Sequence, residues 1–152
     1  MKLVIQRVNE ASVTIEGKIH SSIRKGFLVL IGIQKGDTER EVRYLANKTC
    51  ELRIFSDENE KMNLSLKDLD GEILAISQFT LINDSKKSGN RPSFILAEEP
   101  HLAKKMYEQF LDICKEELGA EKIKSGVFAA YMKIKLENDG PVTIILEKRF
   151  DE

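Results

Sequence analysis

The stretch at positions 27–33, Phe-Leu-Val-Leu-Ile-Gly-Ile, is a continuous apolar run that directly follows Lys25-Gly26. A run of this length without polar alternation is typical of a β-strand buried on both faces. The period then changes to helical spacing, behind a capping box formed by Thr38 and Glu41. The apolar positions of this second segment are Val42, Leu45, Ala46 and Thr49. A buried strand followed by an amphipathic helix of about three to four turns indicates a fold that mixes the two element types.

Strand patterns surround these two elements. We expect strands at 1–8, 11–15, 18–23, 52–55, 73–76, 132–136 and 142–146. Pro100 and Gly119 bound a second amphipathic helix, because proline suits the first helical position and glycine the C-cap. Asn138-Asp139-Gly140-Pro141 predicts a hairpin link between the last two strands. The sequence therefore predicts an α+β domain of residues 1–152, in which two helices cover a largely antiparallel sheet or barrel.

Composition limits the class of protein. With 41% hydrophobic and 32% charged residues, the chain is typical of soluble, ordered proteins. No apolar run approaches the ~18 residues of a membrane span, and the first residues become polar too soon for a signal peptide, so we expect a cytoplasmic protein without a membrane partner. The balance of 24 basic against 25 acidic residues predicts no strong field toward nucleic acid. Cys50 and Cys114 fall on apolar helix faces and are expected to be buried free thiols.

Small polar groups follow the buried strand at 73–76, in the string Ser77-Gln78-Phe79-Thr80-Leu81. Thr80 is a candidate nucleophile, but a hydroxyl attacks only when a base removes its proton. No histidine, lysine or amino-terminal amine lies close in sequence to serve as that base. A structural role stays open, in which these side chains satisfy backbone groups at a sheet edge.

Other catalytic signatures are weak. His20 and His101 have no Cys or His neighbours at metal-ligand spacing, so we expect no metal and no cofactor. No phosphate-binding glycine loop is present. A hydrolase with paired carboxylates stays open, although nothing singles out one pair. Acidic runs such as Glu98-Glu99 are explained by solvation and by their place at a helix start.

Two motifs nevertheless resemble those of one family over essentially the whole chain. Ser77-Gln78-Phe79-Thr80-Leu81 matches the Ser-Gln-x-Thr-Leu motif of the D-aminoacyl-tRNA deacylases, and the string from Asn138 to Thr143 matches their Gly-cis-Pro motif. Supporting matches are Gln6-Arg7-Val8, Ala11-Ser12-Val13, Met62-Asn63-Leu64 and Arg91-Pro92-Ser93-Phe94. The set, in this order and at this length, is highly specific.

The resemblance implies a homodimer with a barrel-like fold that hydrolyses the ester between a D-amino acid and the 3′-terminal adenosine of tRNA. Gly140 and Pro141 of one subunit would reject L-amino acids in the site of the other, and glycine would pass. Arg7 would help to hold that motif across the interface between the subunits. Ser77, Gln78, Phe79 and Thr80 would line the pocket, with backbone N–H groups near Phe79-Thr80 holding the scissile carbonyl.

The same resemblance implies that the 2′-hydroxyl of the terminal ribose assists the reaction, so that Thr80 ranks as a pocket residue before a nucleophile. Lys86, Lys87 and Arg91, in or beside the polar loop at 83–90, are expected to contact the RNA end, and Phe128 to contribute to the adenosine pocket or to the core. Two other readings stay open. One is a related editing domain that removes a misactivated L-amino acid, and the other is a non-catalytic module that binds RNA ends.

Overall fold

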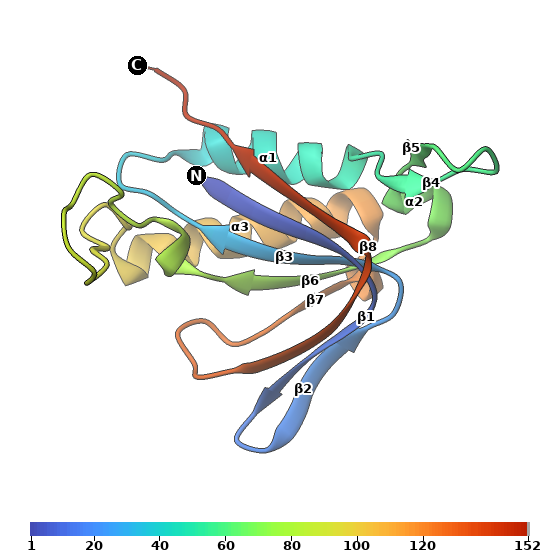
Figure 1. Cartoon of the computed structure of the whole chain (residues 1–152), viewed down its shortest axis with the longest axis horizontal. Coiled ribbons are helices and arrows are strands. Elements are labelled where there is room, and N and C mark those ends of the chain that lie inside the picture. Colours follow the sequence, from blue (N-terminus) through green and yellow to red (C-terminus); the bar gives the residue numbers. More distant parts are fainter. Residues whose placement is uncertain (152) are drawn as a thin grey trace.

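The computed structural model describes residues 1–151, and its elements alternate between strands and helices (Figure 1). In chain order they are β1 (Lys2–Ile15), β2 (Lys18–Ile23), β3 (Gly26–Gly32), α1 (Glu39–Glu51), β4 (Phe55–Ser56), β5 (Met62–Leu64), α2 (Leu66–Leu69), β6 (Glu72–Ser77), η1 (Phe79–Leu81), α3 (Pro100–Leu118), η2 (Ala120–Lys122), β7 (Ile123–Ser125) and β8 (Lys133–Glu147). The elements η1 and η2 are single 3₁₀ turns. The α+β class is confirmed.

The main sheet is mixed and curls into a nearly closed barrel (Figure 1). Its order is β2-β1-β3-β6-β7, with β8 paired to β1. Strand β1 is antiparallel to β2, β3 and β8, whereas β3–β6 and β6–β7 are parallel. The parallel pairs follow from the connections, because α1 lies between β3 and β6 and α3 between β6 and β7, and parallel strands need such crossovers. The expectation of a largely antiparallel sheet therefore holds only for the pairings of β1.

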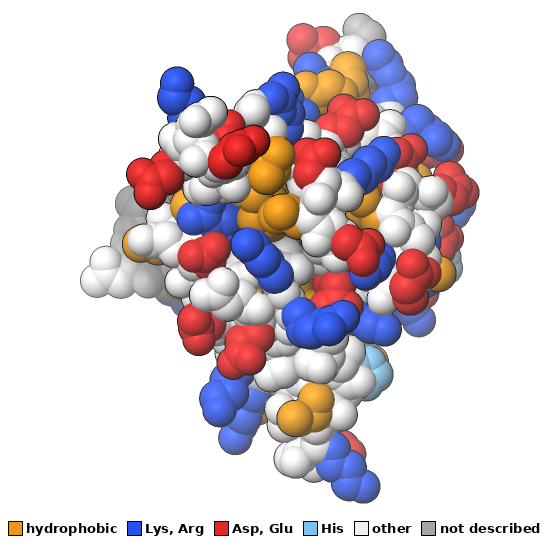
Figure 2. All heavy atoms as spheres, turned by 90° about the vertical axis from the view of Figure 1, so that its right-hand side faces the viewer, with side chains coloured by type: hydrophobic (Ala, Val, Ile, Leu, Met, Phe, Trp, Pro, Cys, Tyr) orange, Lys and Arg blue, Asp and Glu red, His pale blue; other side chains and the backbone are white. Residues whose placement is uncertain are grey.

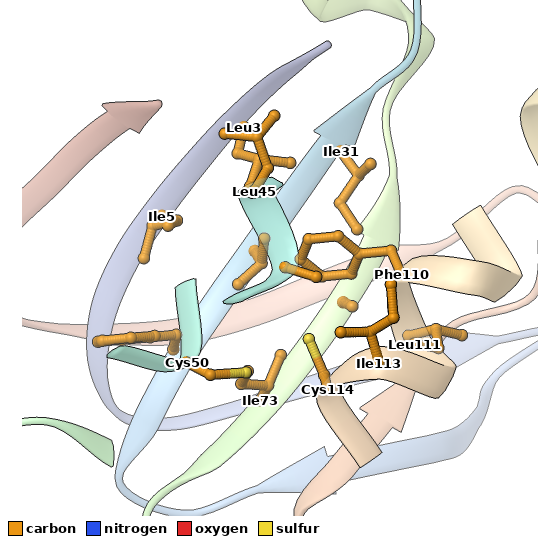
Figure 3. Close-up of a cluster of buried hydrophobic side chains, with 14 of the residues drawn as sticks. Leu3, Ile5, Ile31, Leu45, Cys50, Ile73, Phe110, Leu111, Ile113 and Cys114 are labelled. Carbon is orange, nitrogen blue, oxygen red and sulfur yellow. The ribbon is translucent and has the colours of Figure 1, made fainter. Parts of the chain in front are cut away.

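Strand β3 separates two apolar cores, as its sequence predicts. Phe27, Val29 and Ile31 pack with α1 and α3 in the larger core, while Leu28 faces the smaller core inside the barrel. Figure 3 shows the larger core, where Leu45 of α1 and Phe110 of α3 meet the sheet. The two predicted helices thus cover one face of the sheet, and the short α2 is a third helix that the sequence pattern did not predict.

Two predictions about strands are wrong. The segments at 1–8 and 11–15 form one continuous strand, β1, and the segments at 132–136 and 142–146 are joined in one strand, β8. Asn138-Asp139-Gly140-Pro141 is therefore not a hairpin tip. It is an irregularity within β8, since Val8 pairs with Asn138 but Gln6 pairs with Thr143. Both strands bend at this corner, at the right of Figure 1. Strand β8 continues through the corner because the residues on both sides of it pair with the same long strand, β1.

The thiols of Cys50 and Cys114 are free and buried, where α1 and α3 pack against the sheet (Figure 3). A hydrogen bond with Cys50, together with burial, raises the pKa of the Cys114 thiol above its usual range. Both cysteines are therefore core residues, and the Cys114 thiol keeps its proton at neutral pH.

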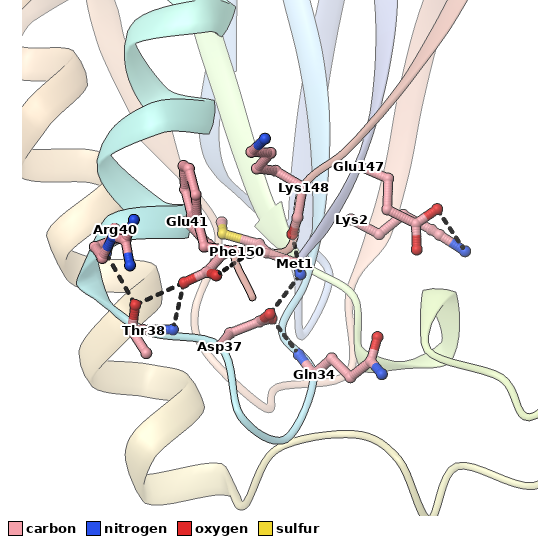
Figure 4. A network of polar contacts seen from close by, with 10 residues as sticks. All are labelled: Met1, Lys2, Gln34, Asp37, Thr38, Arg40, Glu41, Glu147, Lys148 and Phe150. Atoms are coloured by element: carbon pink, nitrogen blue, oxygen red, sulfur yellow. Dashed lines mark hydrogen bonds and ion pairs between the residues drawn. The ribbon is translucent and has the colours of Figure 1, made fainter. Parts of the chain in front are cut away.

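A polar network joins the two ends of the chain to the start of α1 (Figure 4). The Met1 ammonium donates to Asp37 Oδ1 (2.6 Å) and to the Lys148 carbonyl (3.1 Å). Glu41 accepts from the Thr38 hydroxyl (2.7 Å) and amide (2.8 Å) and from the Phe150 amide (2.7 Å), which confirms the predicted capping box. Burial would raise the pKa of Glu41, but these hydrogen bonds outweigh it and lower that pKa to about 2.

The surface carries charges of both signs in close mixture. On the face at the right of Figure 1, Lys and Arg side chains lie among Asp and Glu side chains, with small apolar areas between them (Figure 2). The net charge of −1 is thus not divided into one acidic and one basic side on this face. Within residues 1–151, none of the helices is long and apolar enough to cross a membrane.

Candidate active site

The candidate site begins where β6 ends. Ser77 is the last residue of β6, and the Gln78 amide donates to the Ile31 carbonyl (2.7 Å) of the neighbouring β3. The chain then tightens into η1, in which the first intrahelical bond runs from the Leu81 amide to the Gln78 carbonyl (3.2 Å). The amides of Phe79 and Thr80 precede that bond, so they have no acceptor within the turn. Such N–H groups can hold a carbonyl oxygen that gains negative charge.

A cavity of about 640 Å³ opens beside this turn. Its floor comes from the carboxyl-terminal ends of β3 and β6, one wall from residues 94–100 before and at the start of α3, and the other from residues 128–134 before and within β8. The lining is mainly apolar and aromatic. It includes Ile31, Ile33, Ile76, Phe79, Phe94, Ala97, Phe128, Met132 and Ile134. Its size and apolar lining suit a small organic group.

Backbone contacts fix the first wall. The Lys35 amide donates to the Leu96 carbonyl (2.9 Å), and the Glu98 amide donates to the Ile33 carbonyl (3.0 Å). Phe94 of this wall meets Phe79 edge to face, with ring centroids 5.2 Å apart. The wall is thereby tied to β3 and to the turn at Phe79.

Phe128 is held in the second wall by Tyr107 of α3, whose ring centroid is 6.0 Å away. The Tyr107 hydroxyl donates to the Ala75 carbonyl (2.8 Å) in β6. Burial raises the pKa of Tyr107 to about 12, so this hydroxyl keeps its proton at neutral pH. Tyr107 therefore braces both the wall at Phe128 and the strand that leads to Ser77.

The structure brings together only some of the residues that the sequence predicts for the site. Ser77, Gln78, Phe79 and Phe128 all line the cavity. Thr80 is exposed and does not line it, and its hydroxyl accepts from Gln78 Nε2 (2.5 Å). The expected RNA contacts Lys86, Lys87 and Arg91 are exposed side chains of the loop after η1 and also lie outside the cavity lining.

Gly140 and Pro141 lie at the β1–β8 corner, outside the cavity lining of their own chain. Both are exposed, and the peptide bond between them is cis. Arg7, only 8% exposed, donates from Nε to the Asp139 carbonyl (2.9 Å) and from Nη1 to the Ile54 carbonyl (2.7 Å). It also pairs with the Asp139 carboxylate (3.3 Å). Arg7 thus anchors the residue that precedes Gly140 within its own chain, and its expected role across a subunit interface stays a prediction.

Sequence reasoning missed the charged and polar side chains at the cavity mouth. Lys35, Glu98, Glu99 and Tyr131 all contribute to the lining. Glu98 and Glu99 had been explained by solvation at a helix start, and no sequence pattern connects Lys35 or Tyr131 to a site. Within residues 1–151 no group of three or more His, Cys, Asp or Glu side chains is arranged to hold a metal ion.

Comparisons with known proteins agree on one family. A family model described as D-Tyr-tRNA(Tyr) deacylase matches residues 4–147. A D-aminoacyl-tRNA deacylase of Flavobacterium psychrophilum is 51% identical and is covered completely, as is this chain. Another, of Clostridium novyi, is 51% identical over 98% of both chains.

Two solved structures have the same fold. One is titled c-Myc DNA Unwinding Element Binding Protein and has a TM-score of 0.92 at 43% identity. The match covers 99% of this chain and 100% of that one. The other, titled as a probable eukaryotic D-amino acid tRNA deacylase, has a TM-score of 0.81 at 15% identity over 95% of this chain and 97% of its own, and supports the fold alone. With the family match over nearly the full length, the chain belongs to the D-Tyr-tRNA(Tyr) deacylase family and is a hydrolase of the D-aminoacyl-tRNA deacylase type.

Proposed function

We propose that this enzyme frees D-amino acids, and also glycine, from the 3′-terminal adenosine of tRNA and spares L-aminoacyl-tRNA. The observation that carries the proposal is the position of Ser77, Gln78 and Phe79 at the mouth of an apolar cavity of about 640 Å³. An aminoacyl-adenosine end has one flat apolar base and one ester, which suits a cavity with polar groups at one edge. Because aminoacyl-tRNA is used in the cytoplasm, the enzyme would act there.

In the proposed reaction, water replaces the ribose oxygen on the amino acid's carbonyl carbon, and the ribose hydroxyl leaves with a proton. The amides of Phe79 and Thr80 would hold the carbonyl oxygen as it becomes negative. Thr80 is exposed, and its hydroxyl contacts Gln78, which is no base. A nucleophilic hydroxyl needs a base within reach. We therefore assign the proton transfers to the 2′-hydroxyl of the terminal ribose, with Thr80 as a residue of the pocket edge.

The chirality filter would be Gly140 and Pro141 of a second subunit. Both residues are exposed and lie outside the lining of their own chain's cavity, so in this proposal they act in a partner's site. Their carbonyl groups would accept from the amine of a D-amino acid and repel an L-side chain, which is selectivity by exclusion. A homodimer is required, because one subunit supplies the cavity and the other the filter.

Lys86, Lys87 and Arg91 would meet phosphates near the RNA end. They are exposed, and none of the three makes an ion pair with another residue in the part of the chain that the structure describes. Their contribution would show as a salt-dependent Kd or KM for tRNA, since counterions are released when lysine or arginine neutralises phosphates.

A deacylation assay tests the proposal. The enzyme, treated with chelator, is incubated with D-Tyr-tRNA and with L-Tyr-tRNA, and tyrosine release is followed. We expect rapid release from the D-ester and none above background from the L-ester. Preferred release from the L-ester would indicate an editing domain for L-amino acids, and binding without release would indicate an RNA-end binding module. Either outcome would overturn the proposal.

A further inference from the structure

We propose that Tyr131, followed by Lys133 and Lys135, forms a second RNA subsite beside the cavity, which takes the nucleotide preceding the terminal adenosine. The inference rests on the proposed function, because it assumes that the 3′ end of tRNA enters the cavity. It assigns a role to three side chains that the reaction itself leaves unused.

Tyr131 is 84% exposed although it belongs to the cavity lining. A tyrosine ring buries a large apolar area when it finds a partner, so a ring left open at a site mouth is a candidate for contact with a ligand. Phe79 (57% exposed) and Ile95 (65% exposed) line the same mouth. These three exposed side chains thus lie together where a bound molecule would leave the cavity.

The chain around Tyr131 fixes its position. Ala129 has a left-handed backbone with φ of 63°, and the Ala130 amide donates to the Val127 carbonyl (3.1 Å), so residues 127–130 form a turn. A Cβ on Gly126 would collide with the Met132 sulfur, which shows how closely the two ends of this turn pack. Tyr131 follows directly and is therefore carried on a constrained segment rather than on an open loop.

Beyond Tyr131 the side chains alternate between the cavity and the solvent. Met132 and Ile134 line the cavity, whereas Lys133 and Lys135 are exposed. Residues two apart on a strand share a face and are about 7 Å apart. Lys133 and Lys135 thus lie on one face of β8, and Tyr131 at the cavity mouth precedes that strand by two positions.

Charge favours RNA as the occupant. Neither Lys133 nor Lys135 makes an ion pair with another residue in the range 1–151, and the same holds for Lys35 on the other side of the mouth. An aromatic ring followed by free ammonium groups is the arrangement by which proteins bind single-stranded nucleic acid, with bases stacked on the ring and phosphates on the cations. The tRNA end is single-stranded, and a cytidine precedes its terminal adenosine. Its base would stack on Tyr131 and the adjoining phosphates would meet the two lysines.

The test compares two substrates that differ only in the RNA beyond the adenosine. D-Tyrosyl-adenosine ends at the ester-bearing nucleotide, whereas D-tyrosyl-CCA carries the two preceding cytidines. We expect Tyr131→Ala to lower kcat/KM for D-tyrosyl-CCA roughly 5- to 150-fold, the range of one lost base–aromatic stack, and to leave kcat/KM for D-tyrosyl-adenosine unchanged. Tyr131→Phe should keep the wild-type value for both. Tyr44→Ala, at another partly exposed tyrosine on α1 that lies outside the cavity lining, should change neither.

The lysines are tested by salt. The double variant Lys133→Ala, Lys135→Ala is compared with the wild type for binding of CCA that carries no amino acid. The slope of log Kd against log salt concentration should fall by roughly 0.7 for each lysine lost. Equal loss on both substrates would place Tyr131 in the adenosine or ester site and refute the proposal, as would no loss on either. Dissociation of an oligomer by Tyr131→Ala would assign the ring to a contact between copies and also refute it.

Failure of the proposed function gives a different result. If the wild type releases no tyrosine, the binding of uncharged CCA to the wild type and to Tyr131→Ala still decides the subsite. A weaker Kd for the variant supports it, and an equal Kd removes it.

Discussion

Replacing Arg7 by methionine tests how the Gly140 corner is held. The change keeps most of the side-chain length but removes the guanidinium. The Asp139 and Ile54 carbonyls then lose their donor, and the Asp139 carboxylate loses its partner. Ile54 is only 6% exposed, so water cannot easily take the place of the lost donor there.

The free energy of unfolding should fall by about 3–6 kcal/mol from the two hydrogen bonds. Each of the two hydrogen bonds comes from a charged donor and contributes about 1.5–3 kcal/mol. The ion pair adds less than about 1 kcal/mol, because the Asp139 side chain is 34% exposed and solvent screens it. A loss of this size is a large share of the ~5–15 kcal/mol that stabilises a typical domain.

Urea denaturation at one fixed protein concentration measures the loss, and tyrosine release from D- and L-Tyr-tRNA measures the effect on the site. Two matched variants separate the causes. Asp139→Asn removes only the ion pair and should cost less than about 1 kcal/mol. Arg7→Lys keeps the charge but not the forked geometry, so it should recover no more than about half of the lost free energy.

Under conditions in which Arg7→Met stays folded, we expect the D/L ratio of kcat/KM to fall at least about tenfold, a barrier change of about 1.4 kcal/mol, since the corner is no longer fixed. A loss of stability below about 1 kcal/mol, or a loss equal to that of Asp139→Asn, would refute the reasoning about Arg7. An unchanged D/L ratio of kcat/KM would show that the position of the Gly140 corner does not determine the selectivity.

Three further predictions follow from single residues. Gly140→Ala should cost about 1–3 kcal/mol and lower the D/L ratio, because φ is +138° and the new Cβ would lie 2.8 Å from Val142 Cγ2; denaturation and deacylation assays measure both, and a wild-type ratio would contradict the filter. Thr80→Ala should keep kcat within about tenfold, whereas loss of a nucleophile would reduce it by about a thousandfold or more. For Glu41 the folded pKa is depressed, so its contribution to stability is complete above its ordinary pKa of 4.5 and is lost as the pH falls toward 2. Denaturation between pH 7 and 2 should show this loss in the wild type and a smaller one in Glu41→Gln.

Much of the fold could be predicted from local patterns. The apolar run at 27–33 predicts β3, and the capping box at Thr38 and Glu41 predicts the start of α1. Both signals depend only on residues close in sequence. The path of β8 could not be predicted in this way. Asp139-Gly140-Pro141 has the chemistry of a turn, but its course is decided by β1, which is more than 120 positions away in sequence. Pairing with a long partner overrides a local preference.

The residues of the site also differ in whether the sequence could predict them. Ser77, Gln78 and Phe79 were expected in the pocket because their motif resembles that of the family, and they line the cavity. Lys35 and Tyr131 were not, because only tertiary folding brings the loop after β3 and the segment before β8 to the same mouth.

The continuity of β8 has a consequence for changes of chain length. A hairpin tip tolerates added residues, because the strands on either side keep their pairing. Here Asn138 and Thr143 are both paired to β1, so one inserted residue must either enlarge the irregularity at the corner or shift the rest of the strand. A shift by one position would turn every following side chain of β8 to the opposite face of the sheet. Insertions and deletions at this corner should therefore disturb the sheet more than the same changes in a hairpin tip would.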